Sequence, residues 1–418
     1  METTQEIINI ARKAKEAARS VASLSTEQKN RVLRGVSRKL VKQRTVLQTE
    51  NEKDLINARA QNCAAAFIDR LTLSNKVLDE MIAGLEEVAQ LADPIGAVTG
   101  MWKRPNGLLV GRMRIPLGVV GMIYESRPNV TVDASALCFK AGNAVILRGG
   151  SEALHSNRAL ARLMQEVLEN ERIHPAAIQV IPRADREAVL ELLQLNEYID
   201  VIIPRGGESL IKTVYEHSRI PVIAHYKGVC HVYIDAAADP AMAQTIALNA
   251  KVQRPGVCNA METLLVHRSF AEQHLGKLVS ALQHAGVSIR GCERTCRIAT
   301  GITAATEEDW STEYLDLMLA VRVVDSIDEA MEHIARYGSM HTDAIVTTDY
   351  SNSQKFLREV NSSVVLVNAS TRFNDGNQLG LGAEIGISTS KIHAFGPMGL
   401  TELTTNKFIV YGEGQIRT

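Results

Sequence analysis

The chain has 418 residues, of which 45% are hydrophobic and 22% charged, so we expect two domains and a small third element rather than a single core. Its 46 basic and 47 acidic residues give a formal charge of -1, which offers no electrostatic basis for binding nucleic acid or an anionic membrane. The expected partners are therefore small molecules and further copies of the chain.

Cysteine usage and the start of the chain both predict a cytoplasmic protein. The six cysteines show no pairing framework, and Met1–Gln5 lacks the basic and apolar regions of a signal peptide. No apolar run reaches membrane-spanning length. Cys292 and Cys296 are four residues apart, but no second pair follows at a finger-like spacing, so no metal site is predicted.

Helical periodicity dominates from Thr4 to about Leu91. Ser25-Thr26-Glu27-Gln28 has the pattern of a capping box and predicts the start of a second helix. Asp93-Pro94 ends the helical block. The apolar positions expected to face the core of this block are Ile7, Ala11, Ala14, Ala18, Val21, Val32, Val36 and Leu40.

A projecting hairpin is predicted between Gly100 and Arg114. Asn106-Gly107 readily takes the positive φ angles that a tight turn requires. The run Lys407–Tyr411 near the end of the chain predicts a further strand that pairs with this hairpin, in the same subunit or in another.

Apolar runs alternate with amphipathic helical stretches from Ile115 onward, which predicts a mostly parallel, doubly wound sheet. Such sheets bind ligands at the carboxyl ends of their strands. The expected strands are Leu117–Tyr124, Ala144–Leu147, Ile178–Ile181, Ile199–Ile203 and Val222–Ile223, with helices over Asn157–Leu168 and Ser209–His217.

A second α/β unit is predicted from about Val229 to Asn361. The expected strands are His231–Ile234, Thr263–Val266, Ala320–Val324 and Ala344–Val346, and the expected helices are Ala241–Val252, Ala271–Gln283, Ile327–Tyr337 and Ser353–Val360. Cys258 falls in the turn between a helix and a strand of this unit, which is a rigid place for a nucleophile.

Cys258 follows Pro255-Gly256, a pair that cannot continue a helix and leaves little bulk in front of the thiol. The neighbouring Arg254 favours the thiolate, which is the nucleophilic form. The alternative is that Cys258 is a small buried hydrophobe, the commoner role of a free cysteine.

Two predicted strand ends carry an arginine and two glycines, at Arg148–Gly150 and Arg205–Gly207. Glycines allow a phosphate to approach the backbone, and the following helix start favours negative charge, so a dinucleotide site is plausible. A tight strand-to-helix turn explains either motif alone equally well. No complete G-x-G-x-x-G occurs, since Gly380–Gly386 has the wrong spacing.

A polar, glycine-rich loop is predicted over Asn368–Gly376, after the strand Val364–Val367. Loops of this composition often bind ligands, although an ordinary surface loop has the same composition.

Taken together, these stretches resemble the aldehyde dehydrogenase superfamily over essentially the whole chain. The motifs that carry the resemblance are Pro116–Val119, Tyr124–Thr131, Ile146–Gly150, Ile203–Gly207, Glu262–Val266 and Val367–Phe373. The resemblance implies an α/β, aldehyde-dehydrogenase-like fold with two doubly wound domains and a small β oligomerisation element. It implies a cofactor-binding domain of residues 1–98, 114–228 and 362–396, a catalytic domain of 229–361, and an oligomerisation element of 99–113 and 397–418.

The resemblance also implies roles for individual residues. Cys258 stands at the nucleophile position, and the Asn129 amide at the position that completes an oxyanion hole with the backbone amide of the cysteine. Arg148 and Ser151 are expected beside the adenosine ribose, Gly206 and Gly207 at the pyrophosphate, and Glu313 near the nicotinamide ribose. Relatives that prefer NAD commonly have an acidic residue where Ser151 stands, so NADPH is the expected cofactor.

Within the superfamily, the resemblance is to the members that reduce L-glutamyl 5-phosphate to L-glutamate 5-semialdehyde in proline biosynthesis. The substrate carries a carboxylate and an acyl phosphate, which call for cations and forked donors. Arg127, Arg254 and Arg372 are the expected cations, and Ser370 and Thr371 are expected to complete the phosphate pocket. A surface position or a structural ion pair is the alternative for each arginine.

Hydrolytic relatives have a glutamate about one helix before the cysteine, and it activates water. The matching stretch here, Ala224–Cys230, contains no carboxylate, which agrees with a reaction in which phosphate takes the place of water. Glu262, four residues after Cys258, remains an alternative base.

Three rival functions remain open. The enzyme can act on another acyl phosphate or on a coenzyme A thioester; it can be a cysteine hydrolase with His225, His231 or His267 as base; or it can be a non-catalytic relative. A homo-oligomer is expected, and the sequence leaves open whether the chain docks on glutamate 5-kinase, the enzyme that makes the unstable substrate.

Overall fold

The protein, described here by a computed structural model, is defined over residues 2–183, 185–224 and 226–417, without the side chains of residues 2–4 and 66. The chain forms two compact units. The first unit is Met1–Ala224, Leu381–Gly386 and Met398–Thr418, and the second unit is His225–Gly380 and Ile387–Pro397.

Helices α1 to α5 form the N-terminal block that the periodicity predicted. They are α1 (Glu2–Val21), α2 (Thr26–Lys42), α3 (Arg44–Ala60), α4 (Ala65–Leu71) and α5 (Asn75–Gln90). All the core positions predicted for α1 and α2 are buried. The capping box at Ser25 is confirmed, because its hydroxyl accepts from the Gln28 amide while the Gln28 side chain accepts from the Ser25 amide.

A four-stranded parallel sheet lies at the centre of the first unit, in the order β5-β4-β3-β6. Its strands are β3 (Val119–Tyr124), β4 (Ala144–Arg148), β5 (Ile178–Val180) and β6 (Val201–Arg205), and its remaining helices are α6 (Asn129–Lys140), α7 (Leu154–Asn170), α8 (Arg186–Leu192) and α9 (Glu208–His217). Side chains of α1, α8 and α9 share a core with β3, β4 and β6. The strand predicted at Val222–Ile223 is wrong, since Val222 forms only an isolated bridge to Ile202.

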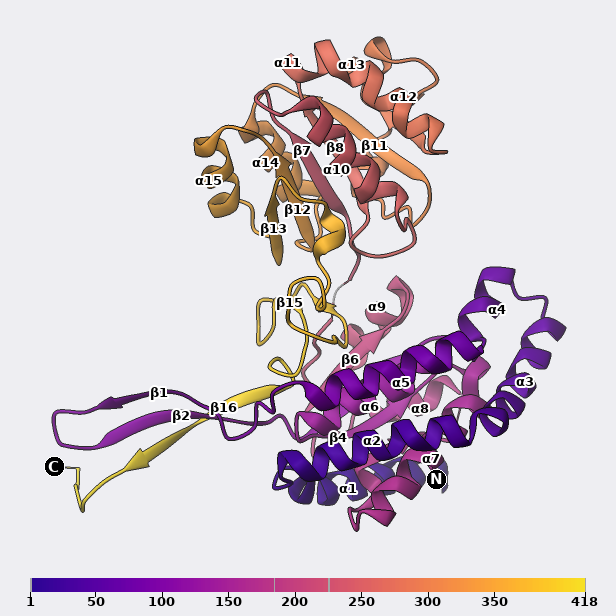
Figure 1. The fold of residues 1–418 in the computed structure, drawn as a ribbon, viewed down its shortest axis with the longest axis vertical. Helices are drawn as coiled ribbons and strands as arrows, with labels where there is room; N and C mark the ends of the chain where they lie inside the picture. The colour runs from indigo at the N-terminus through magenta and orange to yellow at the C-terminus, as the bar shows by residue number, and fades with distance from the viewer. Residues whose placement is uncertain (1, 184, 225, 418) are drawn as a thin grey trace. The chain divides into compact units, whose positions relative to one another are not determined.

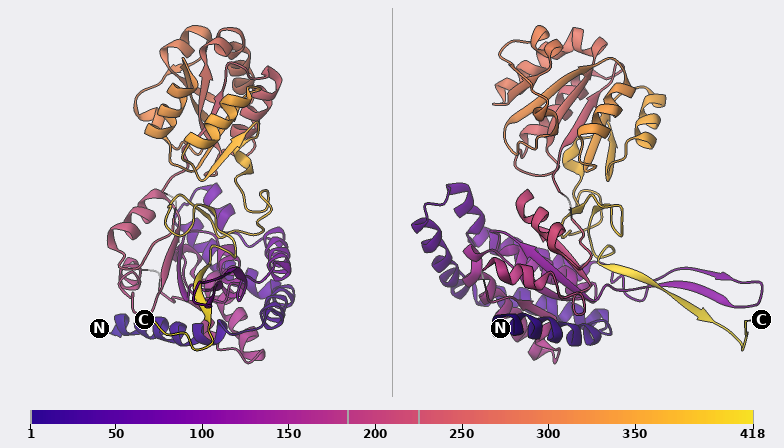
Figure 2. Two further views of the ribbon diagram at one scale, coloured as in Figure 1. Left: turned by 90° about the vertical axis from the view of Figure 1, so that its left-hand side faces the viewer. Right: turned by 180° about the vertical axis from the view of Figure 1, so that it is seen from behind.

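Three antiparallel strands form an arm that extends away from the helices of the first unit (Figures 1 and 2). They are β1 (Val98–Lys103), β2 (Leu109–Pro116) and β16 (Thr404–Tyr411). The predicted pairing of the C-terminal strand with the hairpin is confirmed within the chain, because β16 pairs with β2.

The turn of this arm is less tight than predicted. Only Gly107 has a positive φ, of 90°, and its amide donates to the Arg104 carbonyl at 2.9 Å. Pro105 explains the difference, because its fixed φ suits the first central position of an ordinary turn and leaves the left-handed position to glycine.

A seven-stranded parallel sheet forms the second unit, in the order β10-β9-β11-β8-β7-β12-β13. Its strands are β7 (Cys230–Ile234), β8 (Met261–His267), β9 (Ser288–Gly291), β10 (Thr303–Ala304), β11 (Met318–Val324), β12 (Thr342–Val346) and β13 (Val364–Val367). Its helices include α10 (Pro240–Val252), α11 (Arg268–Phe270), α12 (Gly276–His284), α13 (Glu293–Ile298), α14 (Ile327–Tyr337) and α15 (Tyr350–Glu359), and the short strands β14 (Ile387–Ser388) and β15 (Gly396–Pro397) pair separately.

Alternate residues of the central strands face opposite cores, as a doubly wound sheet requires. Val232 and Ile234 of β7 pack with α10 and α12, whereas Tyr233 packs with α14 and α15. Strands β9 and β10 were not predicted, and the helix expected over Ala271–Gln283 is interrupted by a π turn over Ala271–Leu275.

In the part of the chain that the structure describes, no helix is both long and apolar enough to cross a membrane. No three His, Cys, Asp or Glu side chains among these residues are grouped so that they could hold a metal ion.

Candidate active site

Cys258 lies in the loop between α10 and β8, as predicted, and is half-buried. Its carbonyl oxygen accepts a hydrogen bond from the Cys230 thiol, with 3.1 Å between Sγ and O. Burial raises the pKa of Cys230 well above its usual value, so this thiol keeps the proton that it donates. The backbone of the predicted nucleophile is therefore held in place by a hydrogen bond from a second cysteine.

Gly228 packs directly against the backbone of Cys258. A β-carbon added at Gly228 would lie 2.0 Å from the Cys258 carbonyl oxygen and 2.8 Å from its α-carbon. Real β-carbons do not come that close to backbone atoms, so only glycine fits beside the nucleophile.

Arg372 is held over the same loop by two side chains that flank Cys258 in sequence. Its Nε donates to Gln253 Oε1 at 2.7 Å, and its Nη1 donates to Asn259 Oδ1. Asn259 is fixed in turn by donating to the Asn374 carbonyl at 2.8 Å. The predicted substrate arginine is thus held against the loop that carries the predicted nucleophile.

The charge of Arg372 is coupled to that of Cys258. Burial lowers the pKa of Arg372, the charge of Arg254 lowers it further, and Cys258 and Asp375 oppose the shift. The Arg372 guanidinium therefore lies within electrostatic range of Cys258 and Asp375.

The other predicted residues of the second unit occupy different depths. Arg254 is exposed, whereas Ser370 is buried and caps a short helical turn by accepting from the Arg372 amide. Thr371 is fully buried, and among the described residues its hydroxyl has no hydrogen-bond partner. Glu313 accepts from the Gly228 amide at 2.9 Å.

Glu262, the alternative base, is fully buried and forms an ion pair with Lys251 at 2.6 Å. Its second oxygen accepts from the Leu315 amide at 3.2 Å. A carboxylate with both oxygens engaged and no exposed surface is not placed to activate water, so the structure corrects that suggestion.

The candidate bases of the rival hydrolase do not gather at the thiol. His231 is fully buried and bonds Asp343 at 2.9 Å, and His267 caps α11 by accepting from the Ser269 amide. His225 lies outside the described residues.

In the first unit, Arg148 ends β4, and Ser151 follows at an exposed position. The Arg148 guanidinium donates to the Asp185 carbonyl at 3.1 Å. The next carboxylate, that of Glu152, accepts from the Ser126 amide at 2.7 Å and from the Ser126 hydroxyl at 2.6 Å. The Ser151 hydroxyl donates to the other Glu152 oxygen at 3.4 Å. An arginine and a hydroxyl at the end of β4 are donors of the kind that a ribose phosphate requires.

Gly206 and Gly207 form the turn between β6 and α9. The Gly207 amide donates to the Glu125 carboxylate at 3.0 Å, and a β-carbon at Gly207 would meet nothing within 4 Å. The Gly207 amide at this helix start thus binds an anionic oxygen, and the absence of a side chain leaves the approach to it open, as a phosphate requires. The residues at these strand ends therefore fit the dinucleotide that the resemblance implies.

Asn129 begins α6, and its amide donates to Asp133 one turn later at 3.0 Å. Burial raises the pKa of Asp133 to about 6, while the bond from Asn129 and the charge of Arg205 oppose the shift. Arg127, in the exposed approach to this helix, also belongs to the first unit.

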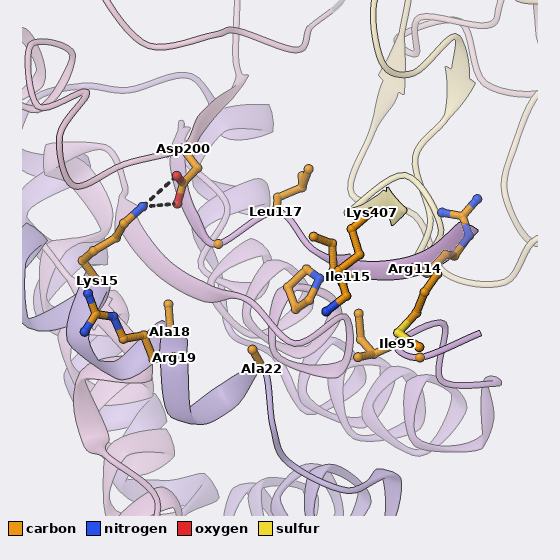
Figure 3. Close-up of a pocket in the computed structure, with 14 residues that line it drawn as sticks. Lys15, Ala18, Arg19, Ala22, Ile95, Arg114, Ile115, Leu117, Asp200 and Lys407 are labelled. Carbon is orange, nitrogen blue, oxygen red and sulfur yellow. Dashed lines mark hydrogen bonds and ion pairs between the residues drawn. The ribbon is translucent and has the colours of Figure 1, made fainter. Parts of the chain in front are cut away.

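A cavity of about 490 Å³ lies at the opposite, amino-terminal ends of β3 and β6 (Figure 3). Apolar side chains such as Ile95 and Ile115 line it, together with Lys15, which bonds Asp200 at 2.7 Å. None of the predicted site residues lines this cavity.

Several contacts of the candidate site were missed from the sequence. The missed residues are Glu125, Asp133, Glu152, Gly228, Cys230, Gln253 and Asn259. Glu125, Gly228 and Cys230 stand inside stretches that were singled out for other reasons, and Gln253 and Asn259 adjoin the residues singled out around Cys258. A glycine beside a strand start was the available signal for Gly228.

The chain matches the model of the aldehyde dehydrogenase family over residues 1–308. It is 59% identical to the γ-glutamyl phosphate reductase of Geotalea daltonii over 417 residues, which cover 100% of both chains. The crystal structure of γ-glutamyl phosphate reductase from Thermotoga maritima superposes with a TM-score of 0.97 at 45% identity, covering 99% of this chain and 100% of that one.

An acetylating aldehyde dehydrogenase from Geobacillus thermoglucosidasius superposes with a TM-score of 0.69 over 100% of this chain and 98% of that one, at 18% identity. That likeness concerns the fold alone. The predicted α/β, aldehyde-dehydrogenase-like fold, with two parallel sheets and small antiparallel ones, is confirmed.

Proposed function

Because the chain belongs to the aldehyde dehydrogenase family, and within it to the γ-glutamyl phosphate reductases, we propose that it reduces L-glutamyl 5-phosphate with NADPH. The products are L-glutamate 5-semialdehyde, NADP⁺ and phosphate, and the reaction is a step of proline biosynthesis. The observation that carries the proposal is the setting of Cys258, a half-buried thiol whose backbone is held by Cys230 and Gly228 in a loop that also orients Arg372.

The Cys258 thiolate attacks the acyl carbon of the substrate, and phosphate leaves to give a thioester. The developing oxyanion is stabilised by the Cys258 backbone amide and the Asn129 side-chain amide, which Asp133 orients. After reduction, collapse of the tetrahedral species breaks the carbon–sulfur bond and releases the aldehyde.

Water activation has no part in this cycle. The stretch Ala224–Cys230, where hydrolytic relatives have their base, contains no carboxylate, and Glu262 is held by Lys251. An enzyme that must keep its thioester from hydrolysis benefits from this lack of a base, and phosphate is already a good leaving group.

Arg148, Ser151, Gly206 and Gly207 are proposed to hold the adenosine phosphates of NADPH, and Glu313 its nicotinamide ribose. When bound, NADPH supplies the hydride that reduces the thioester. The absence of an acid at position 151 and the arginine at the end of β4 support a cofactor with a ribose phosphate.

Arg127, Arg254 and Arg372 are proposed to bind the two anionic ends of the substrate, with Ser370 and Thr371 beside the phosphate. Arg372 is the best supported, because it is half-buried and oriented by Gln253 and Asn259.

The test follows NADP⁺ reduction by glutamate 5-semialdehyde at increasing phosphate concentrations. We expect activity to depend on phosphate, and Cys258→Ala to lower it by roughly 10³-fold or more while the unfolding temperature stays unchanged. Cys296→Ala is the matched control, since Cys296 is also half-buried but lies on α13. Reduction of NADP⁺ that does not depend on phosphate would contradict the proposal. In the opposite direction, so would oxidation of NADPH with acetyl phosphate or acetyl-CoA in place of L-glutamyl 5-phosphate.

A homo-oligomer is the further expectation, supported by apolar side chains that the arm leaves exposed. They include Met101, Trp102, Phe408, Val410 and Tyr411. Apolar side chains gathered on a projecting sheet are typical of a surface that a partner covers. Six free cysteines support a reducing compartment such as the cytoplasm.

We also propose that the chain binds glutamate 5-kinase and receives L-glutamyl 5-phosphate from it directly, because this acyl phosphate is unstable in solution. Co-sedimentation of the two purified enzymes tests it, and no shift in sedimentation at micromolar concentrations would contradict it.

A further inference from the structure

The second unit contains a buried ion pair that the proposed chemistry does not use. Lys251 at the end of α10 and Glu262 at the start of β8 have no exposed side-chain surface, and 2.6 Å separates their charged atoms. Replacing a buried ion pair by apolar residues of similar size is often neutral or stabilising, so stability alone is a weak explanation for it.

The oxygen of Glu262 that does not contact Lys251 lies against a turn under backbone strain. It accepts from the Leu315 amide at 3.2 Å, and Leu315 has a φ of 54°, a left-handed conformation that is uncommon for a bulky residue. Tyr314 lies beside the same pair, with the Lys251 ammonium 6.0 Å from its ring centroid. Such conformations persist when the surroundings hold them in place, and they occur preferentially at functional sites.

The strained turn leads directly to the nucleophile. Glu313, two residues before Leu315, accepts from the Gly228 amide at 2.9 Å. The α-carbon of Gly228 in turn packs on the backbone of Cys258 so closely that no side chain fits between them. A shift of the turn would therefore be transmitted to Gly228 and to the thiol.

We propose that Glu262 is a positioning residue for the reaction: it holds the 313–315 turn through the Leu315 amide, and through Glu313 and Gly228 it fixes the backbone of Cys258, while Lys251 balances the charge of the buried carboxylate. This inference rests on the proposed function for the roles of Cys258 and Glu313. Glu262 acts through the Leu315 amide and not on the substrate.

The test compares two double variants that differ in a single acceptor. Lys251→Met with Glu262→Gln removes both charges but keeps an oxygen for the Leu315 amide, whereas Lys251→Met with Glu262→Met removes that oxygen as well. Lys29→Met with Asp93→Asn is the control, because it removes another buried pair, with a fully buried lysine, in the first unit.

The first readout is the rate of Cys258 alkylation by iodoacetamide without substrate or cofactor, followed by peptide mass with Cys296 of the same molecule as the internal reference. We expect the variant without the acceptor to change this rate by about threefold or more, since thiol reactivity follows the local environment. The variant with glutamine and the control pair should match the wild type.

The second readout is steady-state kinetics. We expect the variant without the acceptor to lose kcat by about tenfold and to show a higher KM for NADPH at an unchanged unfolding temperature, because small displacements of a reacting group are costly. Adding Leu315→Gly should restore part of the loss, as glycine adopts a positive φ without strain. If the variant without the acceptor does not fold alone, the comparison is made with Leu315→Gly in both backgrounds.

Equal alkylation and equal kcat in the two double variants overturn the positioning role. A wild-type protein that does not oxidise NADPH with glutamyl phosphate overturns the proposed function instead, and the alkylation comparison stays interpretable in that case.

Discussion

Gly228 is a residue at which a single added methyl group should lower the rate of catalysis, because it packs against the backbone of the nucleophile. Gly228→Ala would place a β-carbon 2.0 Å from the Cys258 carbonyl oxygen, and a backbone contact cannot be relieved by a side-chain rotation. We expect kcat to fall by roughly 10²-fold, because the thiol must move. Gly256→Ala in the same loop is the control, since its nearest contact would be an ordinary 3.6 Å. Steady-state assays check both, and similar losses in the two variants would contradict the interpretation.

His333 should make the stability of the protein depend on pH. Burial, with the nearby charges of His231, Arg322 and Arg336, lowers its pKa to about 2, and its Nδ1 lies 3.2 Å from Arg322 Nη1 as the acceptor. The folded protein keeps this ring neutral, whereas the unfolded chain binds a proton below about pH 6.5. His333 therefore leaves the free energy of unfolding independent of pH above about pH 6.5 and makes it fall as the pH drops below that value.

We expect His333→Gln to reduce the slope of unfolding free energy against pH by about 1.4 kcal/mol per pH unit between pH 5.5 and pH 4, where the unfolded ring is almost fully protonated. Glutamine keeps an acceptor for Arg322. Urea unfolding at several pH values measures the slope, and His284→Gln is the control because His284 is exposed. An unchanged slope in His333→Gln would count against the neutral buried ring.

At the scale of the element, two helical glycines should respond to alanine with opposite signs. A β-carbon at Gly84 in α5 meets nothing within 4 Å, so Gly84→Ala should stabilise the protein by about 0.5–1 kcal/mol. A β-carbon at Gly35 in α2 would lie 2.8 Å from Val167 of α7, so Gly35→Ala should destabilise it. Urea unfolding of both variants checks the signs, and the same sign in both would be inconsistent with the packing described.

Elements with a strong local signal were predictable from the sequence. The capping box at Ser25, the apolar face of α1 and the helix Ile327–Tyr337 were found as predicted, because each depends on residues a few positions apart. Strands β9 and β10 were missed because they are short and lie toward one edge of the sheet, where little apolar alternation is needed.

The candidate site was predictable to a different degree. Cys258 stood out through Pro255-Gly256, and the resemblance supplied roles for Asn129 and Arg148. The contacts that orient these groups join residues far apart in sequence, such as Arg372 with Asn259 and Gly228 with Cys258. No spacing rule connects such pairs, which meet only once the parallel sheet has formed.

At the scale of the whole molecule, the arm should control assembly. Phe408 is 61% exposed and packs edge-on to Trp102, with their ring centroids 6.4 Å apart. We expect Phe408→Glu to lower the sedimenting mass, because a charge would be buried in the proposed interface between copies. Lys407→Glu is the control, because its side chain lines the cavity at the other face of the strand. A wild-type mass that matches one chain would contradict the oligomer itself.

The chain passes between its two units more than once, and this limits how the protein can be divided. The second unit consists of His225–Gly380 and Ile387–Pro397, so a contiguous fragment ending at Gly380 lacks the segment that contains β14 and β15. Anyone who builds chimaeras from related reductases must therefore transplant both segments together. A single crossover after Ala224 would join the first part of the first unit from one reductase to the segments Leu381–Gly386 and Met398–Thr418 of the same unit from another.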